Sequence, residues 1–493
     1  MKNLKFYTLL ALLLIFGNLS TQAQVPEPVE ILPSPTLIVY HMDQWSDGQI
    51  ILNAVESGVG LYAVIIDEDG NIIDYELWHS YTNTCYFLTE SKFFRMSDGG
   101  LCFYYVKGPE HPTVYKVSIS EDFELTTFEF PDAFPFPEEI SHDDWWNFAW
   151  LPNDDGSTFV SGVYIEGTHC VQMMVRYNEA GEITHQWSEI TSRATTSLLP
   201  PESGASGCRL VMEDPDEVNS ECVVFDDSLN VVDTKHCIYN QAVGIYRPHY
   251  EFFAVHPETD KVYLISDVSF PPFNGNPEIK ADVYMGQFNP DFTQTKYLLG
   301  PYTPTEYDQM ALCEAISFQG ENIYMCGYMN TMFGGNAPDT DNFYVAMLDG
   351  NLNIVGEIYY HNEERMVVPY SIHVLESGDC LVSTAGKDRK TLEMQHAIFR
   401  VPKETFDGID EVHDAGFAVA VAYPNPGKYV LNIRTALLNA QLEIYDLSGK
   451  LIHNQEITDN ITTITTASWP SGTYIWKVIA NGKEAESGKW IKE

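Results

Sequence analysis

The sequence is short of basic residues and of long apolar runs. It contains 27 Lys and Arg against 70 Asp and Glu, which gives a formal net charge of −43 at pH 7. A surface this acidic repels nucleic acid and anionic membranes, so nucleic acid is not an expected partner. No apolar run reaches the roughly 20 residues that a membrane-spanning helix needs. We therefore expect no transmembrane segment.

Motifs of several enzyme classes are also missing. The sequence has no HExxH zinc motif, no GxSxG nucleophile elbow, no P-loop and no dinucleotide fingerprint. We expect no cofactor, and no motif discloses a reaction. A carboxylate pair for glycoside hydrolysis stays open, because any two of the many acids can face each other in a folded chain.

The N-terminus has the pattern of a secretory signal peptide. Two lysines precede an apolar run from Leu9 to Phe16, and Thr21 and Ala23 occupy small-residue cleavage positions. Residues 1–24 are therefore predicted to be a leader that is removed.

The nine cysteines include no CxxC or other metal-ligand spacing. Because their number is odd, at least one thiol stays outside any pairing within the chain. Cys313 and Cys326 flank the turn FQGEN at matching positions, so they could face each other across a hairpin. We expect either a disulfide between these two or buried thiols that act as small apolar residues.

The middle of the chain repeats a strand-turn-strand pattern. Seven copies have an apolar run, a tight polar turn and a second apolar run, as in FFAVHPETDKVYLISDV. Their turns fall near positions 48, 99, 156, 206, 260, 320 and 379, a period of about 55 residues. A hairpin with a turn of Asp, Asn or Gly follows six of them, as in DEDGN at Asp67 and DGNLN at Asp349.

Four-stranded units without helical periodicity between them predict an all-β fold, a seven-bladed β-propeller over residues 25–406. Six or eight blades and a paired sandwich are the alternatives. The last unit lacks a fourth strand, whereas PVEILPSPTLIVYHM near the N-terminus supplies extra β pattern. We expect this N-terminal segment to complete the last blade and to close the ring.

Four long connections are predicted to crowd one face of the ring, around the central channel, which makes that face the candidate binding surface. Adjacent acids and indoles there could stack a sugar ring and hydrogen-bond its hydroxyls, or hold a cation; alternatively, an indole starts an inner strand and packs between blades. Acids near position 340 make Ca²⁺ possible, although they lack EF-hand spacing and are also typical of a solvated turn. The candidate binding residues are His142, Asp143, Asp144, Trp145, Trp146, Arg247, His249, Phe333, Asp339 and Asp341.

The charge is divided unevenly along the chain. Residues 418–493 hold seven basic and seven acidic side chains, and residues 1–24 carry two lysines and no acid. The segment between them therefore carries −45 of the total. Residues 407–417 are polar and read as a linker. After it, short alternating strands with turns such as PNP, SGK and PSG predict a small Ig-like β-sandwich over residues 418–493.

The C-terminal segment contains four motifs in order: YPNP, IYDLSGK, PSGTY and GKWIK. With these motifs it resembles the C-terminal sorting domain of proteins exported by the type IX secretion system of Bacteroidetes. The residues that carry the resemblance are Tyr423, Pro424, Asn425, Pro426, Tyr445, Asp446, Gly449, Lys450, Gly472, Tyr474, Gly488, Lys489 and Lys492.

The resemblance implies an export address. The expected partners are the type IX secretion machinery and its sortase-like protease, which would cut in or near the linker before Phe417. The protein is then expected to pass through the periplasm and across the outer membrane, to be secreted or displayed on the cell surface. For the propeller we expect binding of an extracellular glycan or protein; the alternatives are a propeller-fold glycoside hydrolase and a structural surface-assembly protein.

Overall fold

The structure is a computed structural model of the 493-residue chain. It describes residues 28–34, 36–46, 48–56, 59–80, 85–86, 92–108, 112–137, 145–167, 169–191, 195–213, 220–237, 247–270, 280–299, 308–329, 342–361, 364–406, 420–423, 430–435, 440–458, 461–480 and 483–492.

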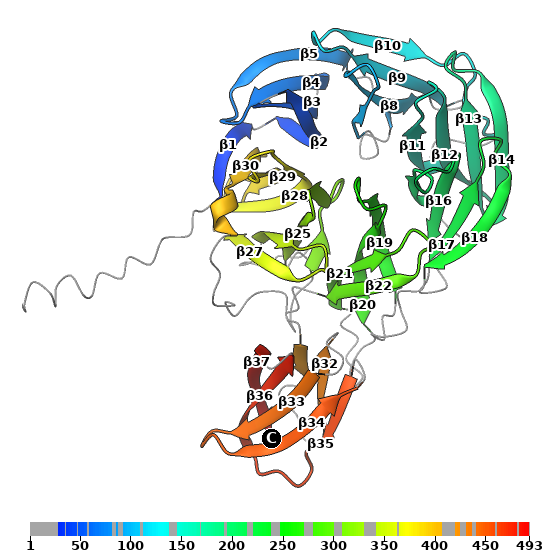
Figure 1. Ribbon diagram of the computed structural model, residues 1–493. Helices are drawn as coiled ribbons and strands as arrows, with labels where there is room; N and C mark the ends of the chain where they lie inside the picture. The colour runs from blue at the N-terminus through cyan, green and yellow to red at the C-terminus, as the bar shows by residue number, and fades with distance from the viewer. Residues whose placement is uncertain are drawn as a thin grey trace, which may run out of the picture.

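The strands between Val29 and Val401 form seven antiparallel sheets in the part of the chain that the structure describes, and these sheets follow one another around a ring (Figure 1). We number them from the N-terminal side. Sheet 1 contains β2 (Leu37–Ser46), β3 (Gln49–Glu56), β4 (Gly60–Asp67) and β5 (Ile72–Ser80). Sheet 2 contains β6 (Cys85–Tyr86), β7 (Phe94–Arg95), β8 (Leu101–Lys107), β9 (Thr113–Ile119) and β10 (Leu125–Glu129). Sheet 3 contains β11 (Trp145–Pro152), β12 (Thr158–Glu166), β13 (His169–Tyr177) and β14 (Ile183–Thr191).

The remaining four sheets complete the ring. Sheet 4 contains β15 (Thr195–Leu199), β16 (Cys208–Glu213), β17 (Ser220–Phe225) and β18 (Val231–Cys237). Sheet 5 contains β19 (Arg247–Val255), β20 (Val262–Phe270), β21 (Lys280–Phe288) and β22 (Gln294–Leu299). Sheet 6 contains β23 (Asp308–Met310), β24 (Ile316–Gln319), β25 (Asn322–Met329), β26 (Asn342–Leu348) and β27 (Ile354–His361). Sheet 7 contains β28 (Arg365–Val374), β29 (Cys380–Asp388), β30 (His396–Val401) and β1 (Val29–Ser34), and the short 3₁₀-helix η4 (Lys403–Thr405) follows it. The predicted all-β propeller is confirmed.

The ring is closed by the N-terminal strand. β1 pairs with β30 in antiparallel register, so that Val29 lies opposite Arg400 and Ser34 opposite His396 (Figure 1). The Arg365 guanidinium adds an ion pair to Glu30 at 2.8 Å. The prediction that the N-terminal segment completes the last sheet is confirmed, and the pairing covers what would otherwise be an open edge of sheet 7.

The outer hairpin turns repeat one local design. In the predicted turns at Asp67 and Asp349, the aspartate accepts the backbone N–H of the residue four positions on, at 2.8 and 2.9 Å respectively. Its second oxygen accepts the side-chain amide of an asparagine at that same position. Gly70 and Leu352, one residue earlier, have positive φ of 82° and 56°. Both predicted turns are confirmed.

The same turns fasten neighbouring sheets together. The carbonyl of the second turn residue accepts a hydrogen bond from a long polar side chain of the preceding sheet in four interfaces among the described residues. The donors and acceptors are Arg400 to Glu68 at 3.0 Å, Arg176 to Asp227 at 3.0 Å, Arg209 to Pro290 at 3.4 Å and Gln287 to Gly350 at 2.8 Å. The apolar core fills the spaces between sheets, so each sheet is stabilised mainly by its two neighbours.

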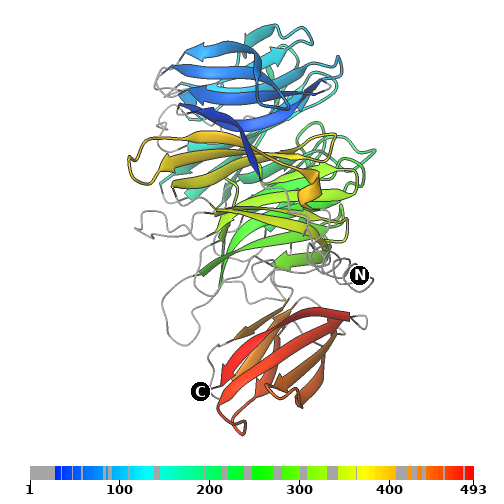
Figure 2. The ribbon, with the colours of Figure 1, turned by 90° about the vertical axis from the view of Figure 1, so that its left-hand side faces the viewer.

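The C-terminal strands form a second unit, coloured orange to red in Figures 1 and 2. β31 (Ala420–Tyr423), β32 (Val430–Thr435) and β35 (Ile461–Thr465) make one sheet; β34 (Leu451–Ile457), β33 (Ala440–Asp446), β36 (Gly472–Ala480) and β37 (Lys483–Lys492) make the other. Leu431 and Ile433 from the first sheet share one apolar core with Leu442 and Trp490 from the second. Two sheets around one core make this unit a β-sandwich.

Among the residues that the structure describes, no helix combines the length and the apolar character that crossing a membrane requires.

Candidate functional site

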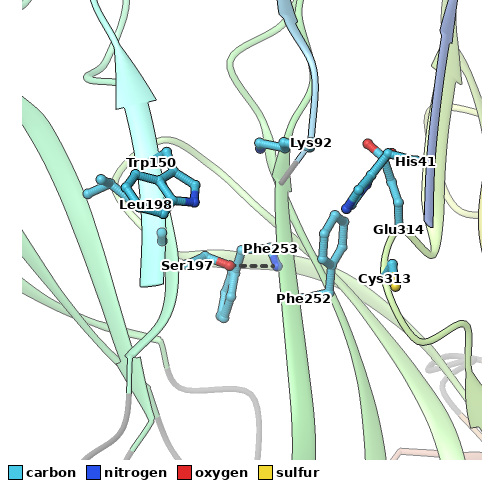
Figure 3. Close-up of a pocket in the computed structure, with 10 residues that line it drawn as sticks. His41, Lys92, Trp150, Ser197, Leu198, Phe252, Phe253, Cys313 and Glu314 are labelled. Atoms are coloured by element: carbon cyan, nitrogen blue, oxygen red, sulfur yellow. Dashed lines mark hydrogen bonds and ion pairs between the residues drawn. The ribbon is translucent and has the colours of Figure 1, made fainter. Parts of the chain in front are cut away.

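The described residues enclose a small cavity in the central channel of the ring (Figure 3). Its volume is about 50 Å³, which is room for a few water molecules or one small chemical group. Sheets 1, 3, 4, 5 and 6 all contribute to its wall, together with a residue just before β7 of sheet 2. The lining residues are His41, Lys92, Ala149, Trp150, Ser197, Leu198, Phe252, Phe253, Cys313 and Glu314.

One side of the cavity is mainly apolar and contains the indole of Trp150. This ring stacks on Tyr104, at a centroid distance of 5.6 Å, and on Phe148, at 5.7 Å. Its Nε1 is buried and has no hydrogen-bond partner among the described residues. Below it, the Ser197 hydroxyl accepts the backbone N–H of Phe253 at 3.3 Å (Figure 3).

The opposite side is polar and depends on a bulge in sheet 6. β23 and β24 both pair with β25, but the residues between them leave the ladder. The Ala311 N–H donates to the Cys326 carbonyl at 3.1 Å, and the Cys326 N–H donates to the Ala315 carbonyl at 3.0 Å. The intervening backbone hydrogen-bonds to β28 of sheet 7 instead, where the N–H groups of Cys313 and Glu314 both donate to Tyr370. A bulge of this kind redirects a side chain, and here it brings Glu314 to the cavity.

The bulge also corrects the expected disulfide. Between the two described residues Cys313 and Cys326 the structure has no disulfide bond. The register explains why, because Ala311 and Ala315 flank Cys326 in the backbone hydrogen bonds while Cys313 lies within the bulge. Both side chains are buried, as the alternative prediction of apolar thiols required.

Charged groups gather beside the polar side of the cavity. His41 Nδ1 lies 3.6 Å from Glu314 Oε2, and Arg95 Nη2 lies 3.8 Å from Asp43 Oδ1. Burial raises the pKa of Asp43 to about 6, with Arg95 opposing the shift and Glu314 adding to it. Burial also lowers the pKa of His373 to about 4, against the attraction of Glu314. These groups come from sheets 1, 2, 6 and 7, so the polar side spans four consecutive sheets of the ring.

The residues predicted from the sequence to bind a ligand are not tested by this geometry. His142, Asp143, Asp144, Phe333, Asp339 and Asp341 lie outside the described residues. Trp145 and Trp146 begin β11, opposite Tyr164 and Val163, and Arg247 and His249 belong to β19, but the positions of these four side chains are not described. Trp145 is the first residue of β11, while the packing of its indole between blades stays a prediction.

Sequence reasoning missed the residues that line the cavity, although a weak signal was present. His41 interrupts the apolar run LIVYHM, and Glu314 interrupts ALCEAISF. An ionisable residue inside a strand of this type needs a partner or a functional reason. No group of three or more His, Cys, Asp and Glu side chains in the described part of the chain is arranged to hold a metal ion.

Solved structures with a similar course of the chain have low similarity scores. The polysaccharide lyase Uly1 is 10% identical, with 74% of this chain and 90% of that chain covered and a TM-score of 0.42. The GH93 α-L-arabinofuranosidase of Fusarium graminearum is 9% identical, with 76% and 98% covered and a TM-score of 0.39. PorZ, a surface component of the type IX secretion system of Porphyromonas gingivalis, is 8% identical, with 92% and 81% covered and a TM-score of 0.22. At these scores no function is inferred from them.

No functionally curated protein matches the chain. One family model does: residues 421–493 match the family described as "Secretion system C-terminal sorting domain". The match covers all seven strands of the second unit except the first residue of β31. The resemblance noted in the sequence motifs is confirmed. The C-terminal unit is therefore a sorting domain of the type IX secretion system, which indicates export of this chain across the outer membrane to the cell surface or the medium.

Proposed function

We propose that this protein is exported through the type IX pathway and that its propeller binds an extracellular glycan or protein at the central channel. The observation that carries the proposal is the cavity itself, where the aromatic residue Trp150 and the acidic residue Glu314 line the same small space. Polar groups that converge in a concave, partly apolar site are typical of ligand binding.

The rest of the proposal concerns processing and the surroundings of the cavity. Residues 1–24 serve as the leader for transfer to the periplasm, and the sortase-like protease cuts before Phe417. The candidate binding residues of the long connections, together with Trp145 and Trp146 at the start of β11, extend the binding surface around the channel. The strongly acidic body keeps the released protein soluble and away from anionic surfaces.

A glycan and matrix-protein array with the purified full chain tests the binding proposal. We expect binding to at least one probe, and weaker binding when Trp145 and Trp146 are both changed to Ala. A matched control changes Trp187, which lies in β14 against Phe225 at a ring distance of 5.0 Å and does not line the cavity. An array with no bound probe would contradict the proposal.

A second candidate, hydrolysis of a glycan, is favoured by one observation. Burial and the charge of Glu314 raise the pKa of Asp43 to about 6, and a carboxyl group with such a pKa can donate a proton near neutral pH. Release of reducing sugar from a bound glycan, lost by at least a hundredfold in Asp43→Asn, would favour the hydrolase. Unchanged release in that variant would exclude Asp43 as the acid.

A further inference from the structure

The sorting domain carries apolar side chains on the outside of one of its two sheets. In the sheet of β34, β33, β36 and β37, the inner face supplies core residues such as Trp476 and Trp490. Among the described residues of the domain, the exposed large apolar side chains are Leu447 at 73%, Leu451 at 44% and Ile491 at 46%. All three belong to this same sheet or to the turn that joins β33 to β34. Burial in the core accounts for the inward side chains, whereas exposed apolar groups gathered in one region are typical of an interaction site.

The strand register brings outward apolar side chains together in one place. Tyr445 of β33 lies opposite Leu451 of β34 on one side and opposite Ile475 of β36 on the other. Ile475 lies opposite Lys489 of β37, and Ile491 follows two residues later. Directly opposed residues of antiparallel strands share a face, and so do residues two apart in one strand, so the group crosses four strands over about 14 Å. We call it the outer patch, and its members are Leu451, Tyr445, Ile475 and Ile491.

A well-ordered turn lies at one end of the outer patch. The Asp446 carboxylate accepts the backbone N–H of Ser448 at 2.8 Å and that of Lys450 at 3.1 Å. The Gly449 N–H donates to the Asp446 carbonyl at 2.9 Å, and its φ of 79° favours glycine. This turn contains the exposed Leu447. Because its backbone is already fixed, a partner that contacts the turn has little chain entropy to remove.

Three of the four sequence motifs of the sorting domain meet at the outer patch. IYDLSGK supplies Tyr445 and the turn, PSGTY ends one residue before Ile475, and GKWIK supplies Ile491. The inward members of these motifs, such as Tyr474 and Trp490, pack in the core. The outward members are far apart in the sequence and come together only on this face. The motifs therefore describe a surface as well as a core.

We propose that the outer patch is the surface through which a protein of the type IX secretion machinery recognises this sorting domain. The inference rests on the export in the proposed function and adds its contact surface. The partner would offer an apolar area, with acidic groups at its edge for Lys450 and Lys489, which are exposed beside the patch. Recognition during export fits this patch better than a later use, because the proposed cut before Phe417 removes it from the released protein.

Secretion of a full-length variant tests the surface. We expect Leu451→Thr combined with Ile491→Thr to give about tenfold less protein in the medium and to leave the full-length chain in the periplasm. The matched controls are Leu77→Thr in β5 and Ile190→Thr in β14, which change exposed apolar residues of the propeller and should be secreted like the parent protein. Differential scanning calorimetry of the purified chains should show the same sorting-domain transition in all of them, because the substituted side chains lie outside the core.

Crosslinking in living cells tests the occupant and does not depend on the folding of the double variant. A photoreactive phenylalanine analogue takes the place of Ile475 in the full-length chain, and mass spectrometry identifies the adducts. We expect adducts with a protein of the secretion machinery. The control position is Thr463, which is exposed on β35 of the other sheet and should give no such adduct. Adducts of position 475 only with the propeller or with a second copy of the chain would overturn the assigned partner.

The outcomes separate this inference from the proposed function. If secretion of the parent protein requires the machinery and the double variant is secreted equally well, the outer patch is overturned and the export stands. If a strain without the machinery secretes the parent protein normally, the export is overturned together with the patch. Binding of a ligand by the propeller is measured on the array and is unaffected by either result.

Discussion

The propeller and the sorting domain solve the problem of burying a β-sheet in different ways. Each sheet of the ring is covered by two neighbouring sheets, and the ring is complete only when β1 joins β30. The sorting domain closes its core with two sheets of its own. The charge differs as well, because the body carries nearly all of the net charge and residues 418–493 carry none. The difference teaches that the sorting domain has a core of its own, from which we predict that each part can be changed without changing the other.

The largest expected effect comes from removing the sorting domain. A chain that lacks residues 407–493 should stay in the periplasm, because the matched sorting domain begins at residue 421. Its propeller should still fold, because among the described residues no strand of the ring lies beyond Val401. Immunoblots of cell fractions and medium measure the export, and limited proteolysis of the periplasmic form measures folding. Normal secretion of the shortened chain would contradict the separation of the two parts.

Removing the closing strand should have the next largest effect, and only on the propeller. Deleting residues 28–34 exposes the edge of β30 and removes the Glu30–Arg365 ion pair. At about 1 kcal/mol for each lost hydrogen bond, we expect a loss of about 5 kcal/mol in the free energy of unfolding of the ring. Differential scanning calorimetry should show a lower transition for the propeller and an unchanged one for the sorting domain. A shift of both transitions would mean that the two parts unfold together.

A core substitution in the sorting domain should give the reverse pattern. Trp490 is fully buried, and its ring packs edge-on against Trp469 at 6.2 Å. Trp490→Ala should destabilise the sorting domain by about 3–5 kcal/mol and leave the transition of the propeller in place. Trp469→Phe, at the margin of the same core, serves as the mild control. We also expect less secreted protein from Trp490→Ala, which the medium fraction measures.

The smallest expected effect is a pH dependence confined to the propeller. His373 has a pKa near 4 in the folded chain and 6.5 without its environment, so the unfolded state binds more protons between these values. The stability contributed by neutral His373 is therefore present above pH 6.5 and is lost as the pH falls toward 4, by about 3 kcal/mol. The unfolding temperature, measured from pH 6.5 down to pH 4, should fall less in His373→Gln than in the parent protein.

Asp43 should act in the opposite direction over part of the same range. Its pKa is about 6 in the folded chain against 3.8, so the folded state binds more protons between these values. Its contribution to stability therefore increases as the pH falls from 6 to 3.8. Asp43→Asn should steepen the acid loss, whereas His373→Gln should flatten it. Equal slopes in the two variants and in the parent protein would mean that neither group has the shifted pKa described here.

Much of the ring was predictable because its signals are local and repeated. Alternating apolar positions and turns such as DEDGN recur along the chain, and both report directly on strands and hairpins. The closing strand was predictable from a comparison of the two ends of the repeat region. The last repeat lacked a strand, and the N-terminal segment had one more than its own repeat needed. The sorting domain was identified from four ordered motifs.

The cavity was not predictable, because its residues meet through contacts far apart in the sequence. Glu314 reaches the channel only because residues 312–314 leave the ladder of sheet 6 and bond to β28 of sheet 7. The same bulge separates the two cysteines that a regular hairpin would have brought together. The position of Trp150 depends on Tyr104 and Phe148, because its indole stacks on both rings and Tyr104 comes from the neighbouring sheet. The predicted loop residues, such as His142 and Asp339, stay a prediction.

The pairing of β1 with β30 has a consequence for quality control during synthesis. Val29 belongs to the first strand of the ring to be made and Arg400 to the last, yet they lie opposite each other. A ribosome that stops early, or a protease that trims the front, leaves a ring that has no partner for one of its two terminal strands. The ring can therefore close only when both its first and its last strand are present.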